Sequence, residues 1–287
     1  MKTFPRLYCH SWENYELLDA GFGKKLERFG SVITIRPEVN AYFKPVLPFS
    51  EWKKQAHWEF IESKGGKGRW RSIQNAPTNW STGYNQLFFE LDISSSKHVG
   101  LFPEQRVNWD FIAKHLEPEH RFLNLFAYTG AASVVARQTG ADVFHVDAVK
   151  QLLTKARINQ ELNELDGIHW VHEDALKFIQ KEVRREKSYD FILMDPPAWG
   201  TGAKGERWKI EDRIDELLGA AAKLLSSEGR LIVNTYSPAL PIQLLNELFE
   251  LYFPAVPFTV EELWMKSATG KELYFGNVGR VLKSDQR

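Results

Sequence analysis

Acidic side chains follow three short apolar segments in the second half of the sequence. They are Asp147 after VFHV (143–146), Asp174 after HWVH (169–172) and Asp195 after FILM (191–194). Carboxylates placed where strands end can accept the hydroxyl groups of a ribose and the amino group of a base. The spacing therefore predicts a site shaped for a nucleoside, with the loop that begins at Asp195 left to face a reacting group.

The segment Asp195–Pro196–Pro197–Ala198–Trp199 is an unusual way to end a buried strand. Proline cannot donate a ladder hydrogen bond and restricts the residue before it, so the loop is predicted to be stiff. A stiff loop would hold acceptors in fixed directions toward an amino nitrogen and localise its lone pair. Trp199 is predicted to stack on a flipped base and so to offset part of a flipping cost of a few kcal/mol. The alternative is that Trp199 packs against a helix over 214–225.

The loop after the apolar segment FLNLF (122–126) carries one glycine, Gly130, just before a predicted helix. A tight turn there lets backbone N–H groups face a ligand. The spacing is not G-x-G-x-x-G, so a nicotinamide oxidoreductase is the least favoured class. An ordinary turn would look the same, and helix capping alone would account for Asp147 and Asp174.

Apolar segments and helical patterns alternate along the chain from residue 122 onward. The predicted strands are 122–126, 143–146, 169–172, 191–194 and 230–234, and the predicted helices include 150–163, 214–225 and 241–251. Strands that alternate with helices indicate βαβ units and a parallel sheet. The predicted fold class is α/β, with a doubly wound Rossmann-like sheet that binds ligands outside the carboxyl ends of its strands.

The first part of the chain lacks long helical patterns and is predicted to be a smaller β-rich domain over 1–95, followed by the α/β domain over 96–287. Strands are predicted at 32–37 and 87–93, and a short helix near 51–62. Basic residues alternate with tryptophans there, which suits single-stranded RNA. These residues are Lys53, Lys54, Lys64, Lys67, Arg69, Arg71, Trp52, Trp58 and Trp70. Glutamates dilute the patch and tryptophans often enter a core, so a structural role stays open.

Taken in order, these segments resemble the class I S-adenosylmethionine-dependent methyltransferases, and more narrowly the family that includes bacterial 23S ribosomal RNA base methyltransferases. The residues that carry the resemblance are GLFPEQR (100–106), NLFAYTG (124–130), VDAVKQLLTKARINQELN (146–163), HEDALKFI (172–179), ILMDPPAWG (192–200) and LLSSEGRLIVNTYS (224–237). They span most of residues 97–240. The resemblance implies a Rossmann-like methyltransferase domain, S-adenosyl-L-methionine as cofactor and an RNA partner.

The resemblance also assigns site residues. Those expected at the cofactor are Arg106, Asn124, Phe126, Ala127, Tyr128, Thr129, Gly130, Asp147, Ala148, Asp174, Ala175 and Asp195. The loop 124–130 would bind the methionine half, with Arg106 near its carboxylate. Asp147 would hold the ribose and Asp174 the adenine. The residues expected to face the methyl group and the substrate are Asp195, Pro196, Pro197 and Trp199.

One departure from the related cytosine enzymes bears on mechanism. Methylation at carbon 5 of cytosine needs a cysteine thiolate, which in those relatives follows the fifth strand. This chain has Tyr236 near that position, and its single cysteine, Cys9, lies far away in the sequence. The loop at 195–199 instead resembles the (Asp/Asn)-Pro-Pro-aromatic loop of amino-methyltransferases, with Ala198 inserted. Transfer to a nitrogen is therefore predicted.

The loop TGAKGERWK (201–209) is rich in glycine and lysine. It is predicted to be a flap over the site, with Lys204, Arg207 and Lys209 available to phosphates. A plain solvated loop is the alternative.

Composition limits the remaining choices. Lys+Arg and Asp+Glu both number 37, so the formal net charge is zero and does not indicate a nucleic-acid partner. One cysteine excludes an intrachain disulfide and fits a reduced, cytoplasmic protein. No apolar run approaches the roughly 20 residues of a membrane span. His169 and His172 are three apart on a strand and would point to opposite faces, so no metal site is expected.

The sequence therefore predicts a methyltransferase that acts on a base of ribosomal RNA, at nitrogen. The alternatives are a methyltransferase acting on a small molecule or a protein, and a non-catalytic RNA assembly factor that binds S-adenosylmethionine. Oligomeric state stays open.

Overall fold

The computed structural model describes residues 3–63, 68–201 and 207–282, which form two compact units. The larger unit comprises Met1–Leu7, Val107–Leu263 and Gly276–Arg287, and the smaller comprises Tyr8–Arg106 and Trp264–Phe275. The predicted division took two consecutive segments, 1–95 and 96–287. The units interleave instead, because residues near the end of the chain pack with the first part; the Thr269 hydroxyl, for example, donates to Asp19 at 2.7 Å.

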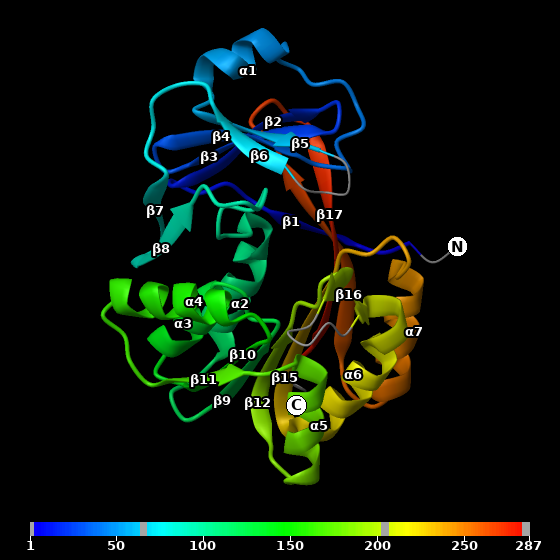
Figure 1. Ribbon diagram of the computed structural model, residues 1–287. Helices are drawn as coiled ribbons and strands as arrows, with labels where there is room; N and C mark the ends of the chain where they lie inside the picture. The colour runs from blue at the N-terminus through cyan, green and yellow to red at the C-terminus, as the bar shows by residue number, and fades with distance from the viewer. Residues whose placement is uncertain (1–2, 64–67, 202–206, 283–287) are drawn as a thin grey trace. The chain divides into compact units, whose positions relative to one another are not determined.

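The described part of the larger unit is built on an eight-stranded sheet of order β1-β16-β17-β15-β12-β9-β10-β11 (Figure 1). The strands are β1 (Arg6–Cys9), β9 (Arg121–Leu125), β10 (Asp142–Asp147), β11 (Ile168–His172), β12 (Tyr189–Met194), β15 (Leu225–Thr235), β16 (Phe258–Lys266) and β17 (Glu272–Val281). The strands from β15 through β11 are parallel, and β17 is antiparallel to β15. The predicted doubly wound sheet is confirmed.

Helices cover both faces of this sheet, with α5, α6 and α7 side by side on one face and α3 and α4 together on the other (Figure 1). Their bounds, with that of α2, are α2 (Arg106–His115), α3 (Ala131–Gln138), α4 (Lys150–Leu162), α5 (Ala175–Arg184), α6 (Ile210–Leu224) and α7 (Ile242–Tyr252). Helix α6 buries Ile210, Ile214, Leu217, Leu218 and Ala221. That spacing forms one apolar stripe along a helix, which explains why this segment lies on the sheet.

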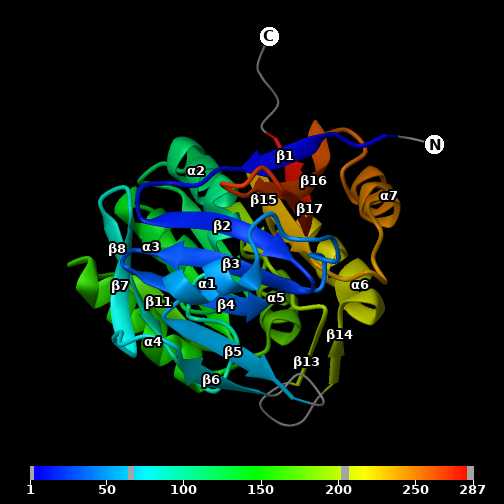
Figure 2. The ribbon, with the colours of Figure 1, turned by 90° about the horizontal axis from the view of Figure 1, so that it is seen from above.

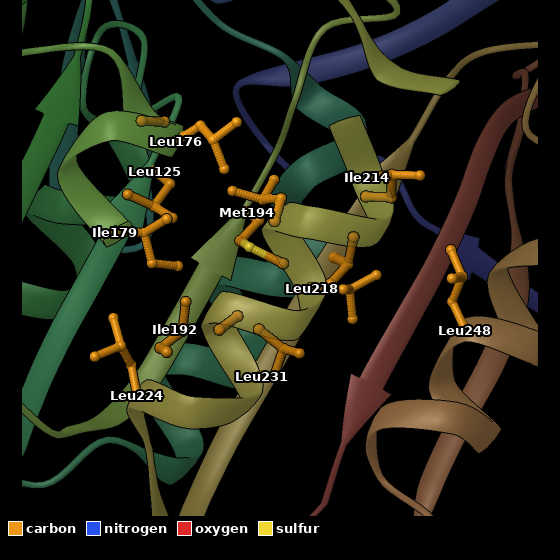
Figure 3. Close-up of a cluster of buried hydrophobic side chains, with 14 of the residues drawn as sticks. Leu125, Leu176, Ile179, Ile192, Met194, Ile214, Leu218, Leu224, Leu231 and Leu248 are labelled. Atoms are coloured by element: carbon orange, nitrogen blue, oxygen red, sulfur yellow. The ribbon is translucent and has the colours of Figure 1, made fainter. Parts of the chain in front are cut away.

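The core of the larger unit is a cluster of aliphatic side chains between the sheet and the α5–α7 layer (Figure 3). Leu125, Ile192 and Leu231 come from neighbouring strands, and Ile179 and Leu218 come from the helices above them. All of these side chains are fully buried or nearly so. Burying one side chain of this size contributes about 1.5–3 kcal/mol, so the layer holds the strand ends in fixed positions.

The smaller unit has, among its described residues, a five-stranded sheet of order β2-β3-β4-β5-β6 and a separate hairpin, β7–β8 (Figure 2). Their bounds, with the helix between β4 and β5, are β2 (Tyr15–Gly21), β3 (Lys24–Phe29), β4 (Val32–Pro37), α1 (Phe49–Gln55), β5 (Trp58–Glu62), β6 (Gly68–Ser72), β7 (Asn79–Tyr84) and β8 (Leu87–Asp92). The pairs are antiparallel except β4–β5, which α1 connects as a crossover. The helix predicted near 51–62 therefore ends at Gln55, and the rest of that segment joins the sheet.

None of the helices lying in residues 3–63, 68–201 and 207–282 is long and apolar enough to cross a membrane.

Candidate active site

The carboxyl ends of the central strands lie at one level of the sheet in the larger unit. Leu125, the last residue of β9, is in register with Val146 of β10 and with Met194 of β12. Asp147 at the end of β10 is in register with His172 of β11. The strand order reverses between β9 and β12, which is where open α/β sheets bind ligands. The loops after these strands emerge together, and they carry most of the predicted site residues.

The loop after β9 has an unusual backbone. The φ angles of Phe126, Tyr128 and Gly130 are 57°, 52° and 83°. A residue with a side chain held at positive φ costs about 1–3 kcal/mol, and such strain concentrates at functional sites. The Ala127 N–H donates to the Val146 carbonyl at 3.1 Å, which ties the loop to β10. The loop is thus held in a conformation that its own residues do not prefer.

Gly130 lets helix α4 approach this loop closely. A Cβ at this position would lie 2.9 Å from the Ala156 Cβ, so any larger residue would push the helix away. From the same helix, the buried Asn159 side-chain amide donates to the Thr129 carbonyl at 2.8 Å. Helix α4 therefore supports the loop from beneath.

Asp147 links the loop after β9 to the end of β10. Its two carboxylate oxygens accept the N–H groups of Tyr128 and Val149, both at 2.9 Å. Burial raises the pKa of Asp147 above its ordinary value, while the Val149 and Tyr128 N–H groups oppose that rise. A carboxylate has about four acceptor positions, and the N–H groups of Tyr128, Val149 and Ala148 do not fill all of them, so Asp147 can still accept from a ligand hydroxyl group. This is the arrangement expected of a ribose acceptor.

A buried polar chain lies behind the loop. The Asn124 amide donates to the Ser133 hydroxyl at 2.9 Å, and that oxygen is 3.0 Å from the His145 Nδ1. Burial lowers the pKa of His145 to about 3, so its ring is neutral and can accept from Ser133. Asn124 is 2 % exposed, and its contact with the cofactor stays a prediction. Sequence reasoning missed Ser133 and His145; a histidine within the apolar strand VFHV was the available signal.

Asp174 caps helix α5. Its Oδ1 accepts the Lys177 N–H at 2.9 Å, as the alternative of helix capping predicted, and the adjacent Ala175 is buried. The His172 ring donates to the Ala148 carbonyl at 3.1 Å, which joins the loops after β10 and β11. A carboxylate oxygen has more than one lone pair, so capping leaves Asp174 able to accept from a base amino group.

Trp208 holds the loop after β12. Its indole N–H donates to the Pro197 carbonyl at 2.7 Å, and its ring lies 4.8 Å from the Phe126 ring at an angle of 56°. The Asp195 N–H donates to the Leu125 carbonyl at 3.4 Å at the other end of the loop. Trp208 thus contacts both the Pro-Pro loop and the loop after β9. Sequence reasoning missed it, because an indole in a Gly- and Lys-rich segment looks like a surface residue.

Trp199 begins a short hairpin in which β13 (Trp199–Thr201) pairs with β14 (Arg207–Lys209). Its side chain is 64 % exposed, so the alternative of packing against the helix is wrong. Arg207 and Lys209 are also exposed. Lys204, the other basic residue predicted on the flap, lies outside the described residues.

Arg106 belongs to the smaller unit. Its guanidinium donates to the carbonyls of His10 and Ser11, at 3.1 and 3.0 Å, and lies 5.7 Å from the Trp12 ring. Its role at the cofactor carboxylate stays a prediction.

The described residues contain no group of three or more His, Cys, Asp or Glu side chains that could hold a metal ion. The two histidines of β11 have separate partners. His169 lies 2.8 Å from Asp142, and His172 makes the contact with Ala148 described above.

The predicted basic and aromatic patch of the smaller unit is largely structural. Trp52 is fully buried and donates to Asp19 at 3.1 Å, so its predicted stacking role is wrong. Trp58 and Trp70 donate to the carbonyls of Pro77 and Ser96. Lys64 and Lys67 lie outside the described residues. Exposed basic side chains remain at Lys53, Lys54, Arg69 and Arg71.

A strained loop after the first parallel strand, a buried acid after the second and a Pro-Pro loop after the fourth define a nucleoside-cofactor site on a doubly wound sheet. The pattern of the family described as S-adenosylmethionine-dependent methyltransferase matches residues 65–263. The chain is also similar to a solved SAM-dependent methyltransferase from Agrobacterium tumefaciens, with 33 % identity, a TM-score of 0.89, and 98 % of this chain and 97 % of that chain covered. The chain belongs to the S-adenosylmethionine-dependent methyltransferases, and its cofactor is S-adenosyl-L-methionine.

Two relatives with longer chains carry the name "Ribosomal RNA large subunit methyltransferase K/L". The protein from Hahella chejuensis is 39 % identical over 217 residues, which cover 73 % of this chain and 28 % of its own length. The protein from Shewanella frigidimarina is 30 % identical over 175 residues, covering 60 % and 24 %. The chain thus spans about a quarter of the length of these curated relatives.

Proposed function

We propose that this methyltransferase transfers a methyl group to a ring or exocyclic nitrogen of a base in ribosomal RNA. The similarity to the K/L relatives, whose printed name refers to large-subunit ribosomal RNA, supports the choice of substrate. The loop that begins at Asp195, fixed by Trp208, is the observation that carries the choice of chemistry.

The residues at the strand ends fit the cofactor. Asp147 accepts the ribose hydroxyls with the lone pairs that its backbone contacts leave, and Gly130 keeps loop and helix close enough for N–H groups to face the methionine half. Asp174 accepts from the adenine amino group. Bound S-adenosylmethionine supplies an electrophilic methyl group. Arg106 is proposed to contact the cofactor carboxylate.

The substrate side of the site suits a nitrogen nucleophile. Asp195 and the loop carbonyls accept hydrogen bonds from a base, which localises the lone pair on its nitrogen without any reorganisation of the loop. Trp199 offers an exposed ring for stacking. The thiol of Cys9 is 1 % exposed and contacts the Pro103 carbonyl at 3.3 Å, so it does not have the exposure of a reactive thiolate.

The test is transfer of labelled methyl from S-adenosylmethionine to unmodified large-subunit ribosomal RNA. Wild type should label the RNA, and Asp195→Ala should lose most of the activity. Trp199→Ala should lower turnover more than cofactor affinity. Nuclease digestion then identifies the nucleoside, and a label at carbon 5 of a pyrimidine would overturn the nitrogen assignment. No label in RNA with normal cofactor binding would reject the RNA substrate in favour of a small molecule or a protein.

A further inference from the structure

Several exposed apolar side chains of the smaller unit lie on the turn 21–23 between β2 and β3 and on the loop 38–46, which together we call the aromatic tip. Phe22, Val39, Tyr42 and Val46 are 58, 81, 86 and 54 % exposed. Single exposed apolar residues need no explanation, but several on adjoining segments mark an interaction surface.

The two segments of the aromatic tip are joined by hydrogen bonds. The Phe22 N–H donates to the Phe43 carbonyl at 2.8 Å, and the Gly23 N–H donates to the Ala41 carbonyl at 2.7 Å. A Cβ on Gly21 would lie 2.3 Å from the Pro45 nitrogen, so the turn and the loop touch directly. The turn and the loop are therefore held against each other.

The end of the loop is anchored as well. The buried Asp19 carboxylate accepts the Leu47 N–H at 2.8 Å and the Val46 N–H at 3.4 Å. An ordered loop presents its side chains to a ligand with little further loss of conformational entropy.

Phe22 is held against its own preference. Its φ is 50°, in the left-handed region that suits glycine or asparagine in a turn. Its ring stays mostly exposed, with the Phe49 ring at 6.1 Å as a neighbour. Because the Phe22 ring is exposed, packing of this ring does little to offset the backbone strain. A strained backbone angle that packing does not explain suggests a functional role.

Positively charged side chains lie at the aromatic tip. Lys44 is the one charged side chain between Val39 and Ser50, and it is exposed. The Lys271 ammonium lies 5.4 Å from the Phe43 ring. The carboxylate at the edge, Glu38, forms an ion pair with Lys25 at 3.5 Å.

We propose that the aromatic tip binds a single-stranded segment of the RNA substrate, with bases stacked on Phe22 and Tyr42 and a phosphate on Lys44. The proposal rests on RNA being the substrate. Stacking on exposed rings beside a positive charge is how proteins hold single-stranded nucleic acid. A protein partner would also suit the exposed rings, but it would leave the charge of Lys44 unused, because lysine is depleted at protein–protein interfaces.

The test compares Phe22→Ala, Tyr42→Ala and Lys44→Gln with wild type in RNA methylation and in binding of the same RNA at several salt concentrations. Each aromatic variant should raise the KM for RNA by about 5- to 100-fold, as expected for the loss of one stacked base. Lys44→Gln should reduce the slope of log affinity against log salt by about 0.7. Cofactor affinity should not change. Phe88→Ala, which removes a phenylalanine 49 % exposed on β8, is the matched control and should behave as wild type.

Three outcomes would overturn the assignment of the aromatic tip. If wild type methylates RNA and the folded variants keep its KM within twofold, this surface alone is rejected. If the variants change oligomeric state while the KM for RNA stays unchanged, the surface serves a second copy of the chain. If wild type neither binds nor methylates RNA, the proposed function falls first and the surface proposal falls with it.

Discussion

The two units bury polar side chains in different ways. In the larger unit, Asn124, Ser133 and His145 form a neutral chain beneath the loop after β9, and Asp147 accepts backbone N–H groups at the same edge of the sheet. Asp147 lies beside the loops that follow β9 and β10. A buried group that keeps a free lone pair near solvent is available to a ligand.

In the smaller unit, the buried charges around Glu27 pair with one another. Glu27 is fully buried; it accepts from Tyr15 at 2.9 Å, from Arg36 at 2.8 Å, and pairs with Lys25 at 3.4 Å. Burial acts to raise the pKa of Glu27, but Arg36 and Lys25 outweigh burial and hold the pKa below its ordinary value. A network that uses all of its charges internally offers little to a ligand. Buried charges such as Glu27 therefore stabilise the smaller unit, whereas a buried acceptor such as Asp147 in the larger unit is placed to bind a ligand.

The largest effect expected from this difference is that of Glu27→Gln on stability. Removing the Glu27 charge leaves Arg36 buried without its paired carboxylate, which costs about 3–5 kcal/mol, while Lys25 keeps its ion pair with Glu38. The free energy of unfolding from urea denaturation measures this loss. The half-exposed Glu16, which pairs with Arg28 at 3.4 Å, gives a matched control, and Glu16→Gln should cost less than about 1 kcal/mol. Equal losses in the two variants would mean that the Glu27 network does not stabilise the unit.

Asp147→Ala, unlike Glu27→Gln, should affect cofactor binding rather than stability. We expect S-adenosylmethionine affinity to fall by about 100-fold or more, since a hydrogen bond to a charged group contributes about 1.5–3 kcal/mol and two ribose hydroxyls are involved. Isothermal titration calorimetry measures this affinity. As the pH is lowered, protonation of Asp147 should weaken S-adenosylmethionine binding. In the wild type this fall in affinity should begin at a higher pH than for an ordinary aspartate, because burial raises the pKa of Asp147. Unchanged affinity in the variant would remove Asp147 from the ribose role.

The same contrast explains what the sequence predicted well. The parallel sheet was predictable because apolar strands and helical stripes are local patterns, and the site loops followed because parallel strands bring their carboxyl ends to one edge. Asp147 and the loop 124–130 were placed at that edge in this way, and their contacts with the cofactor stay predictions. The support given by Trp208 was not predictable, because its contacts with Pro197 and Phe126 join segments far apart in the sequence.

The smaller unit was less predictable for a physical reason. Strand β3, for example, buries the charged residues Lys25 and Glu27, so the alternation of apolar and polar residues that reveals a strand is broken. Trp52 was interpreted as a surface ring because its neighbours are lysines, yet it fills the core of this unit. The late segment Trp264–Phe275 completes the unit through contacts that no local pattern reveals.

His145 should make the stability of the larger unit depend on pH. Its pKa is about 3 in the folded state and about 6.5 in an unfolded chain, so the unfolded state binds more protons between these values. Stability is therefore full above pH 6.5 and falls as the pH drops, by about 2 kcal/mol at pH 5. His145→Asn, whose amide can still bond Ser133, should show a correspondingly smaller loss between pH 7 and pH 5 in urea denaturation.

The matched control for this pH effect lies in the smaller unit, where burial and neighbouring cations lower the pKa of His98 to about 3 as well. The His98 contribution is common to wild type and His145→Asn, so the difference between their pH profiles isolates His145. Parallel profiles would show that protonation of His145 is not linked to unfolding.

Trp208→Phe is expected to have the smallest effect of these substitutions. It gives the most direct comparison of what a buried hydrogen bond does in each unit. The variant keeps a ring against Phe126 but removes the hydrogen bond to the Pro197 carbonyl, which contributes about 0.5–1.5 kcal/mol. If that bond positions the Pro-Pro loop, kcat for RNA methylation should fall by about 2- to 10-fold, while S-adenosylmethionine affinity stays within twofold.

Trp80→Phe removes the same kind of bond, from an indole N–H to the Phe29 carbonyl at 3.1 Å, in the smaller unit. It should lower the melting temperature with kcat per folded molecule retained. A purely structural role for Trp208 would give that result for both variants. A loss of kcat in Trp208→Phe alone would establish that the larger unit uses this indole to hold a loop for chemistry, since the two substitutions remove equivalent contacts and differ only in what those contacts hold.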